Sequence, residues 1–282
     1  MINSIDHLIV CVNDLEEAEK NYTKLFGFNP VFRGEHIDLG TKNSIFNFKN
    51  TYLELLSSCG SGPGATFVNE ALKKHGEGLA GMALNVNNVM DCFNYLRKKN
   101  YIVNEPITGS GVNADNSMTR KWKSLFLPSE LSRGLFLYLI EHTEGLLGLA
   151  GTFEDSSINK LDHIVINTND GDGFIKVYRD VFKIRLALDK VIEHWKKRIL
   201  FFRTNNTTIE VIESNSSEVK SDNFWGLAWR TKSIKESHKR LTDEGIEITP
   251  IKKGLKENTL VATIKSHTNN VPTLLIEHLN QS

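Results

Sequence analysis

Residues 34–58 read GEHIDLGTKNSIFNFKNTYLELLSS, and this stretch decides how the rest of the chain is interpreted. Its final part, residues 52–56, has the composition of a strand in which Leu53 and Leu55 share one face and Glu54 lies on the other. An ionised carboxylate among apolar neighbours is costly unless a partner compensates its charge. Glu54 therefore predicts a nearby metal ion, arginine or bound ligand.

The bulk properties exclude several classes of protein. The 282 residues suffice for two domains, and Lys+Arg and Asp+Glu both number 34, so a nucleic-acid partner is not expected. No apolar run reaches membrane-spanning length and no signal peptide is recognisable, which predicts a cytoplasmic protein without a membrane partner. The cysteines, Cys11, Cys59 and Cys92, are odd in number and widely spaced, which argues against disulfides and a CxxC zinc site.

One order of elements, a strand, a helix and three strands, is predicted twice in the first half of the chain. The first set is predicted at 5–12, 15–26, 29–33, 44–48 and 51–57, and the second at 79–86, 88–99, 102–105, 121–127 and 134–142. A further helix at 67–74 connects the two sets. Asp14 is typical of a helix N-cap and Gly27 of a helix stop, which delimits the first helix.

The second half of the chain repeats the first. Asp162-His163-Ile164-Val165 follows Asp6-His7-Leu8-Ile9 by 156 positions, and Thr208-Ile209-Glu210-Val211 follows Tyr52-Leu53-Glu54-Leu55 by the same number. Two matches at one offset indicate an internal duplication. The sequence thus predicts an α+β fold of four βαβββ units, forming one module at 1–146 and a second, partly degenerate module at 158–282.

Five motifs carry a resemblance to a known family. They are Ile5-Asp6-His7-Leu8-Ile9, the turn Gly34-x-His36-x-x-x-Gly40-Thr41-x-Asn43, Tyr52-Leu53-Glu54-Leu55, Gly78-Leu79-Ala80-Gly81-Met82-Ala83-Leu84 and Leu139-Ile140-Glu141-His142. The chain resembles the vicinal oxygen chelate superfamily, in particular its glyoxalase-like branch. The resemblance implies two glyoxalase/dioxygenase-like modules whose curved mixed sheets enclose a cleft for a small molecule. In metal-dependent members that cleft holds a divalent ion.

The resemblance also implies which residues would bind a metal. Its ligand positions fall on His7, Glu54 and Glu141, with His163, Glu210 and Glu277 as counterparts in the second module. A position that is often histidine falls on Gly81 and Gly226, so an iron extradiol dioxygenase is disfavoured. The remaining ligands suit Zn, Mn, Mg or Ni, and a cleft without any metal is an equal alternative. Another alignment places Tyr138, on the opposite face of the strand, at the last ligand position instead of Glu141. If Glu141 faces the cleft, its neighbour His142 faces away from it and is interpreted as structural.

Four further side chains are predicted to line the cleft. His36 would move a proton together with Glu54, and Asn43 would contact the substrate, although both residues also suit a plain turn. Arg120 and Trp122 alternate along one strand, which fits either the binding of an anionic or planar group or an exposed ladder of side chains.

Two functions remain open at this point. One is metal-assisted lyase, isomerase or transferase chemistry on a small oxygen-rich molecule. The other is metal-free binding or sequestering of a small molecule, of the resistance type, without catalysis. Whether the chain is an enzyme is therefore undecided. Either function is compatible with a second module that serves only as scaffold, and with a monomer or a homodimer.

Overall fold

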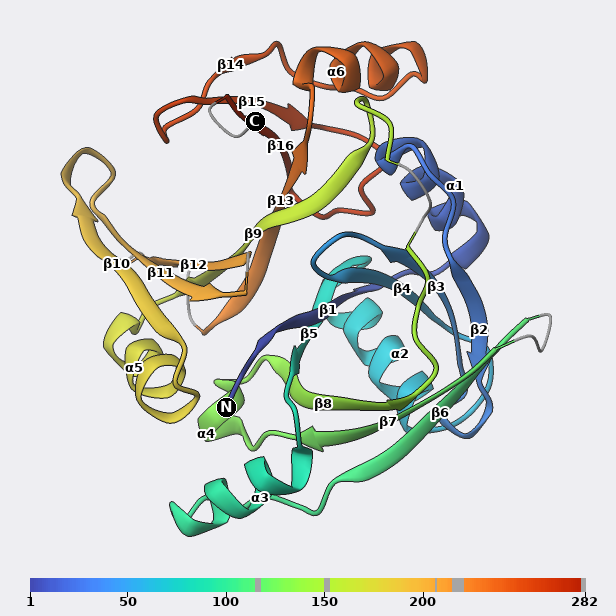
Figure 1. Ribbon diagram of the computed structural model, residues 1–282, viewed down its shortest axis with the longest axis vertical. Coiled ribbons are helices and arrows are strands. Elements are labelled where there is room, and N and C mark those ends of the chain that lie inside the picture. Colours follow the sequence, from blue (N-terminus) through green and yellow to red (C-terminus); the bar gives the residue numbers. More distant parts are fainter. Residues whose placement is uncertain (115–117, 150–152, 206, 215–220, 280–282) are drawn as a thin grey trace.

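The computed structural model describes residues 1–114, 118–149, 153–205, 207–214 and 221–279 and contains the four predicted βαβββ units (Figure 1). The elements of the first module are β1 (Ser4–Cys11), α1 (Leu15–Phe26), β2 (Phe32–His36), η1 (Ile37–Leu39), β3 (Thr41–Asn47), β4 (Tyr52–Ser58), α2 (Pro63–His75), β5 (Gly78–Asn85), α3 (Val89–Lys98), β6 (Ile107–Asn113), β7 (Thr119–Phe126), α4 (Ser129–Ser132) and β8 (Phe136–Glu144). The elements of the second are β9 (Ile158–Thr168), α5 (Gly171–Ile175), η2 (Lys176–Val181), β10 (Arg185–Ile192), η3 (Glu193–Trp195), β11 (Lys197–Thr204), β12 (Thr207–Glu213), β13 (Asn223–Thr231), α6 (Ile234–Asp243), β14 (Lys252–Lys253), β15 (Thr259–Ile264) and β16 (Thr273–His278). The predicted α+β class is confirmed.

Local sequence signals explain how the helices begin and end. The Asp14 side chain accepts hydrogen bonds from two backbone N–H groups in the first turn of α1, and Gly27 ends that helix with a φ of 79°. The apolar stripe of α1 buries Tyr22 and Phe26, and the helix packs on β3 and β4. Helix α2 starts earlier than predicted because Pro63 suits a first helical turn, where no N–H donor is needed.

The first eight strands form a closed barrel in the order β1-β4-β3-β2-β6-β7-β8-β5. The pairs β1–β4 and β5–β8 are parallel, as expected for strands joined by a crossover. Closure depends on a short pairing of β2 with β6, in which Gly34 lies opposite Asn113 and Glu35 opposite Val112. A side chain on Gly34 would collide with the ring of Phe32 and the carbonyl oxygen of Val112, so this close approach requires glycine.

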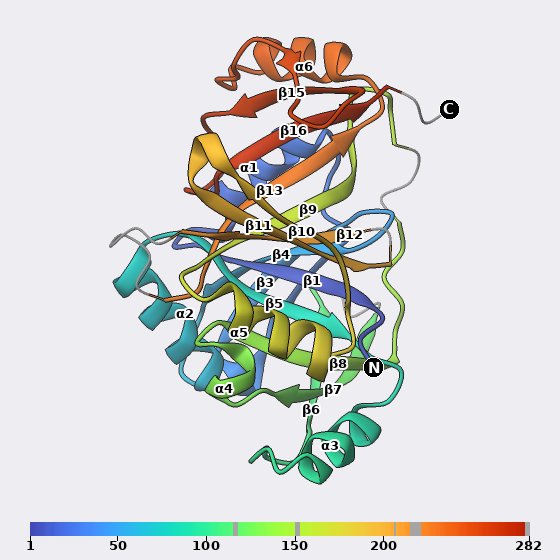
Figure 2. The same cartoon turned by 90° about the vertical axis from the view of Figure 1, so that its left-hand side faces the viewer.

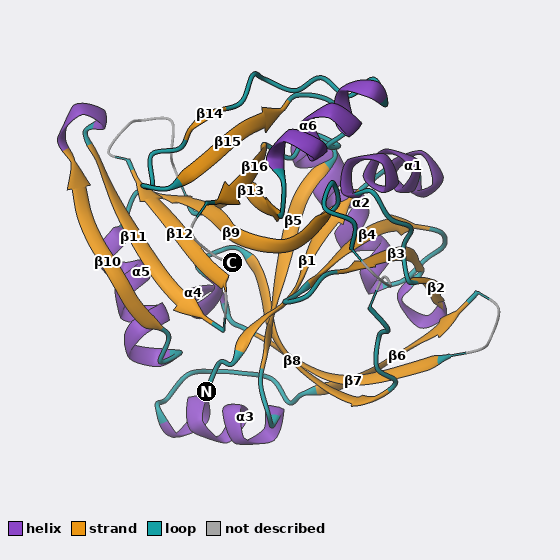
Figure 3. Cartoon of the chain, turned by 45° about the horizontal axis from the view of Figure 1, so that its top comes forward, coloured by secondary structure: helices purple, strands orange, loops and turns teal. Residues whose placement is uncertain are grey.

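The second sheet has the same strand order but stays open. Its order β10-β11-β12-β9-β13-β16-β15-β14 corresponds to that of the barrel cut between β2 and β6. Strand β14 has two residues where β6 has seven, and in the described part of the chain it pairs only with β15. Figure 3 shows the β10–β11 hairpin standing apart from β14, whereas the β6–β7 hairpin continues the first barrel.

One hydrophobic core joins the outer faces of both sheets to the helices that cover them. Trp229 of β13 is fully buried in it and packs on Phe26 and Phe48, at ring-centroid distances of 5.1 and 4.5 Å. Helices α3 and α6 lie at opposite ends of the molecule (Figure 2). In the described residues, no helix has the length and hydrophobicity needed to cross a membrane.

Candidate functional site

Polar side chains from five strands converge on the inside of the first barrel. On β4, Leu53 and Leu55 join the outer core, so strand alternation directs Glu54 inward. The other inward polar or aromatic residues are His7 on β1, Asn43 on β3, Tyr52 on β4, Arg120 and Trp122 on β7, and Tyr138 and His142 on β8. The structure therefore brings together all the sequence-predicted site residues except Glu141, and His36 joins them from the end of β2.

His7 is held in place by hydrogen bonds at both ring nitrogens. Its Nδ1 lies 2.7 Å from Asp6 Oδ1 and its Nε2 lies 2.8 Å from the hydroxyl of Tyr138. A shift in the register of β1 against β5 leaves Asp6 unpaired in the ladder, and this bulge lets Asp6 reach the same side as His7. Asp6 also contacts His142 Nε2 at 3.0 Å. The roles of Asp6 and His142 were missed by sequence reasoning, because period-two alternation does not anticipate a bulge.

Electrostatics favour an ionised Asp6 and protonated tyrosines. Burial alone would raise the pKa of Asp6, but hydrogen bonds and charge interactions with His142 and His7 hold that pKa well below its ordinary value. Burial, followed by the charges of Glu54 and Asp6, keeps the pKa of Tyr138 well above its ordinary value. The Tyr138 hydroxyl therefore remains a hydrogen-bond donor at neutral pH.

The carboxylate of Glu54 has two partners. Its Oε1 accepts a hydrogen bond of 2.5 Å from Asn43 Nδ2, and its Oε2 lies 3.6 Å from His7 Nε2. Because a carboxylate only accepts, the amide nitrogen of Asn43 must face Glu54, which leaves the Asn43 Oδ1 atom buried without a partner. Glu54 is thus satisfied by neighbours within the protein and does not neutralise the guanidinium of Arg120.

Arg120 is a buried cation of the barrel interior, and no ion pair holds it among the described residues. Its side chain is buried, with 6% of the residue exposed, and its guanidinium lies over the rings of Tyr52 and Phe32 at 5.3 and 5.8 Å. Its hydrogen bond is a long one of 3.4 Å to the neutral Tyr52 hydroxyl, and its Nε is buried without a partner. No carboxylate of the described residues lies within ion-pair distance of this guanidinium.

His36 and Trp122 form another wall of the same interior. The His36 ring meets Trp122 edge to face at 5.6 Å, and its Nδ1 lies 3.0 Å from the Thr41 hydroxyl. Burial lowers the pKa of His36, and the charge of Glu54 opposes this only in part while Arg120 and His7 reinforce it. His36 is therefore neutral at pH 7 and able to accept or donate one hydrogen bond.

The predicted third metal ligand, Glu141, lies outside the barrel. Its Oε2 accepts a hydrogen bond of 2.9 Å from the backbone N–H of Val89, so it caps the start of α3. Tyr138 faces inward on the same strand, and a residue three positions later must face outward. This corrects the interpretation of the Glu-His pair: His142 faces the interior and Glu141 faces the helices. The alternative alignment, which placed Tyr138 inside, matches the geometry.

The second sheet repeats part of this arrangement. His163 Nδ1 lies 2.9 Å from Asp162 Oδ1, and His163 Nε2 lies 3.4 Å from Glu210 Oε2. His278 reaches Asp162 at 2.6 Å, as His142 reaches Asp6. Glu277 caps α6 through the backbone N–H of Ile234, as Glu141 caps α3.

The other inward residues of the barrel are not repeated in the second sheet. The strand registers place Ile192 where the barrel has His36 and Ile199 where it has Asn43. They place Thr208 in the position of Tyr52 and Leu274 in that of Tyr138. The 3-10 turn η3 follows Ile192 as η1 follows His36.

The donor set in the barrel does not match a chelating metal site. His7 and Glu54 converge, but no group of three or more His, Cys, Asp or Glu side chains in the described residues is arranged to hold a metal. At the position often occupied by histidine, a Cβ on Gly81 would meet the ring of Phe136 at 2.7 Å and Ile9 at 3.2 Å. The space for that ligand is therefore taken by apolar side chains, while Arg120 adds a positive charge to the same interior.

A wide groove lies beside α1, and of the inward residues only Asn43 is among those that line it. It has a volume of about 770 Å³ and runs between α1 and strands β2, β3 and β6. Its lining has three acidic and three basic residues, and Arg33 contacts Glu19 at 2.7 Å. We place the candidate site inside the barrel, where the buried guanidinium of Arg120 has no ion-pair partner among the described residues, rather than in this open groove of balanced charge.

The paired βαβββ modules with inward His and Glu side chains define a protein of the vicinal oxygen chelate class. A family model described as "Glyoxalase-like domain" matches residues 5–182, more than half of the chain. A second, described as "Glyoxalase/Bleomycin resistance protein/Dioxygenase superfamily", matches residues 162–263. The chain therefore belongs to the glyoxalase-like domain family, with two such domains in tandem. No curated protein sequence matches it.

Solved structures of similar fold span several activities. A mutant of 4-hydroxymandelate synthase from Streptomyces coelicolor has a TM-score of 0.70 at 15% identity, covering 98% of this chain and 92% of that chain. A hypothetical protein from Staphylococcus aureus has a TM-score of 0.67 at 12% identity, covering 98% and 99%. The Mn(II)-bound glyoxalase from Novosphingobium aromaticivorans has a TM-score of 0.66 at 14% identity, covering 99% and 83%. At these identities the likeness concerns the fold alone.

Proposed function

We propose that the interior of the first barrel binds a small, oxygen-rich anion through Arg120, without using a divalent metal. The observation that carries this proposal is the buried guanidinium of Arg120, which has no carboxylate partner among the described residues. An unpaired buried charge is costly, and the cost is removed when a ligand supplies the opposite charge. The planar guanidinium matches a carboxylate or a similar oxyanion through two parallel hydrogen bonds.

The neighbours of Arg120 support a ligand that is rich in oxygen. Tyr52 and Tyr138 keep their protons because burial raises their pKa values. The Tyr52 hydroxyl accepts from Arg120 and can donate to a ligand, whereas the Tyr138 hydroxyl donates to His7 Nε2, because His7 Nδ1 donates to the Asp6 carboxylate. His36 is neutral and offers a further polar contact, while Trp122 supplies a flat apolar wall. Such a mixture of aromatic surface and a few placed polar groups is typical of small-molecule sites. The site supports binding, and the class of any reaction is left open by this proposal.

Metal-assisted chemistry is the competing function, and the donor set argues against it. Two converging ligands, His7 and Glu54, are fewer than a stable divalent site normally needs. Both are also engaged by other protein groups, His7 by Asp6 and Tyr138 and Glu54 by Asn43. The proposal therefore assigns His7 to the positioning of Tyr138, and Glu54 to the positioning of Asn43.

Thermal unfolding with a panel of small carboxylates tests the proposal. Lactate, malonate and citrate are added to the full chain in excess EDTA, and at least one is expected to raise the Tm. A ligand at about 100 times its Kd stabilises the folded state by about 2.7 kcal/mol, which is several degrees for a chain of this size. The variant Arg120→Gln is expected to lose this response, while Arg97→Gln, which removes an exposed arginine on α3, keeps it.

Two outcomes would contradict the proposal. If Arg120→Gln responds to the carboxylates as the wild type does, the anion is not bound by Arg120. If stabilisation requires added Mn²⁺ or Zn²⁺ and disappears in Glu54→Gln, a metal at His7 and Glu54 carries the function instead.

A further inference from the structure

The open second sheet carries a cluster of cations on its concave face. Lys160 on β9 and Arg230 on β13 are direct partners in the antiparallel ladder, so their side chains leave the sheet side by side. Their strand neighbours Leu161 and Trp229 belong to the hydrophobic core on the convex face. Strand alternation therefore places Lys160 and Arg230 on the concave face, where both are half-buried.

Two more basic residues approach this pair. Arg203 on β11 shares the concave face, because its neighbour Phe202 lies in the convex core. Lys49 comes from the first module, where its backbone N–H donates to the carbonyl oxygen of Asn159, next to Lys160. We refer to Lys160, Arg203 and Arg230 as the basic patch, with Lys49 at its border.

The charges of the basic patch are not balanced by acidic side chains. None of its three members forms an ion pair with a carboxylate in the described parts of the chain, and the hydrogen bond of Arg203 goes to the neutral Thr208 hydroxyl at 2.6 Å. Asp162, the acidic group nearby, is occupied by His163 and His278. Burial lowers the pKa of Lys160, and Arg230, Lys49 and Arg203 lower it further against the opposing charge of Asp162.

The fold itself does not require cations at these positions. The strand registers give Ser4 as the counterpart of Lys160 in the first module, and Asn85 as that of Arg230. There Asn85 donates to Asp6 and accepts from the side chain of Asn3, so two neutral residues fill the same place with hydrogen bonds. Like charges placed directly opposite each other destabilise a sheet. A ligand of opposite charge would remove this repulsion.

We propose that the basic patch binds a phosphorylated small molecule bearing at least two negative charges, at a site separate from the interior of the first barrel. Three cations on one open face offer more positive charge than a single carboxylate would neutralise. Two of them are arginines, whose forked donors fit phosphate oxygens, and the lysine adds a compact point charge. Arg203 is exposed and Lys160 and Arg230 are half-buried, so such a ligand can reach them from solvent. The strands fix the backbones of all three residues, so they are partly organised before binding.

Titration of the full chain with pyrophosphate, at constant ionic strength, tests this proposal. Saturable binding by calorimetry and a higher Tm are expected for the wild type. The double variant Lys160→Gln/Arg230→Gln is expected to weaken pyrophosphate binding at least about a hundredfold, since each lost charge-assisted contact corresponds to roughly tenfold. The same variant without ligand should have a higher Tm than the wild type, because the repulsion between positions 160 and 230 is gone. Arg203→Gln is a second variant that removes a cation without altering the β9–β13 pair.

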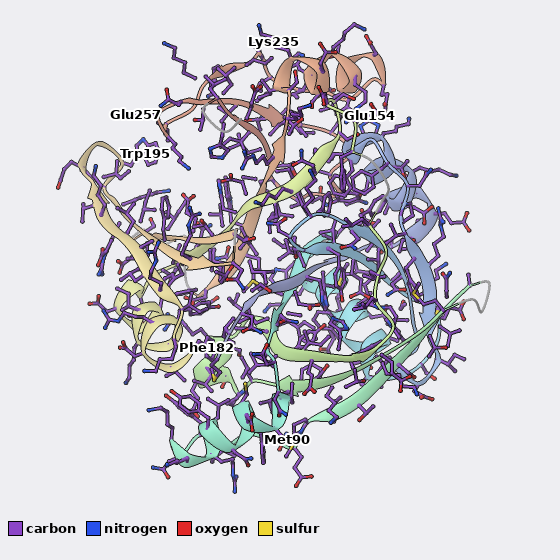
Figure 4. All side chains as sticks on the ribbon, viewed as in Figure 1. Met90, Glu154, Phe182, Trp195, Lys235 and Glu257 are labelled. Carbon is purple, nitrogen blue, oxygen red and sulfur yellow. The ribbon has the colours of Figure 1, made fainter. Side chains whose placement is uncertain are left out.

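Controls separate this site from other sources of binding. Lys235→Gln removes an exposed lysine on α6, at the far end of the second module (Figure 4), and should bind pyrophosphate as the wild type does. The double variant should keep the Tm response to lactate in EDTA that is assigned to Arg120, which distinguishes the patch from the barrel. Equal pyrophosphate binding by the wild type and the double variant would overturn the proposal. So would binding of a single-stranded oligonucleotide that pyrophosphate fails to displace, since that would indicate a nucleic-acid backbone as the ligand.

Discussion

The first barrel and the second sheet hold the same four side chains in different surroundings. Each has an aspartate between two histidines and a glutamate facing one of them. In the barrel the side chains of His7 and Glu54 are 3% and 9% exposed, whereas those of His163 and Glu210 are both 18% exposed. The difference follows from closure, because β6 is long enough to meet β2 and β14 is too short to meet β10.

Some side-chain arrangements occur in both halves of the chain, and others occur in one half only. The Asp-His-Glu-His set and the glutamate caps of α3 and α6 occur in both halves, which is expected of groups that organise the fold. Arg120 and its polar neighbours are confined to the closed barrel, and the basic patch to the open sheet. Function is therefore assigned to the features that differ rather than to those that repeat. The following predictions test that division.

The largest effect is expected from the buried aspartate of the barrel. Asp6→Asn leaves one of His7 and His142 without an acceptor in a buried place, so the free energy of unfolding should fall by about 3–5 kcal/mol. Asp162→Asn, whose side chain is 21% exposed against 8% for Asp6, should cost about 1–2 kcal/mol. Urea unfolding at pH 7 measures both, with Asp38→Asn as an exposed control. Equal losses for Asp6 and Asp162 would show that closure of the barrel does not strengthen this set.

The same aspartate sets a pH dependence. The pKa of Asp6 is lowered in the folded protein, so the unfolded chain binds its proton first as the solution is acidified. The stabilisation by Asp6 is therefore complete above about pH 4, the ordinary range for aspartate, and is lost as the pH falls below it. The gap in stability between wild type and Asp6→Asn should narrow in that range. A gap that is constant down to pH 2 would contradict the assignment of Asp6 as an ionised acceptor.

The fold was predictable from the sequence because its signals are local or repeated. The cap at Asp14, the stop at Gly27 and the recurrence of the Asp-His motif each fix an element without knowledge of distant contacts. The face of β8 that points to the interior was not predictable from the sequence. The motif Leu139-Ile140-Glu141-His142 is compatible with either face of the strand pointing inward. The deciding contacts, from Tyr138 to His7 and from Glu141 to the start of α3, join strands far apart in the chain.

The chemistry of the site was less predictable than its residues. Arg120 and Trp122 were found by strand alternation, and Asn43 and His36 by the family turn. That no carboxylate of the described residues lies within ion-pair distance of Arg120 is a property of packing, and the sequence alone does not show it. The bulge that turns Asp6 inward and the short β14 that leaves the second sheet open are likewise decided by long-range pairing.

An intermediate effect is expected from the helix caps that both halves share. Glu141→Ala and Glu277→Ala each remove the acceptor for the first backbone N–H of a helix, α3 or α6, and each should lower the free energy of unfolding by about 1 kcal/mol. Neither change should alter the response to carboxylates in EDTA. Glu144→Ala, an exposed residue of β8, serves as the control. If Glu141→Ala abolished ligand binding while Glu277→Ala did not, Glu141 would belong to the site after all.

The smallest effect is expected from His36, which the second sheet replaces with Ile192. Burial lowers the pKa of His36, so between that lowered value and about pH 6.5 the unfolded chain binds one more proton than the folded chain at this position. Stability should therefore decline as the pH falls below about 6.5, and His36→Gln should flatten the decline while keeping a polar group beside the Thr41 hydroxyl. Urea unfolding between pH 5 and 8 measures this, with the exposed His75→Gln as the control. If His36→Gln has the same dependence of unfolding free energy on pH as the wild type, another group takes up the proton.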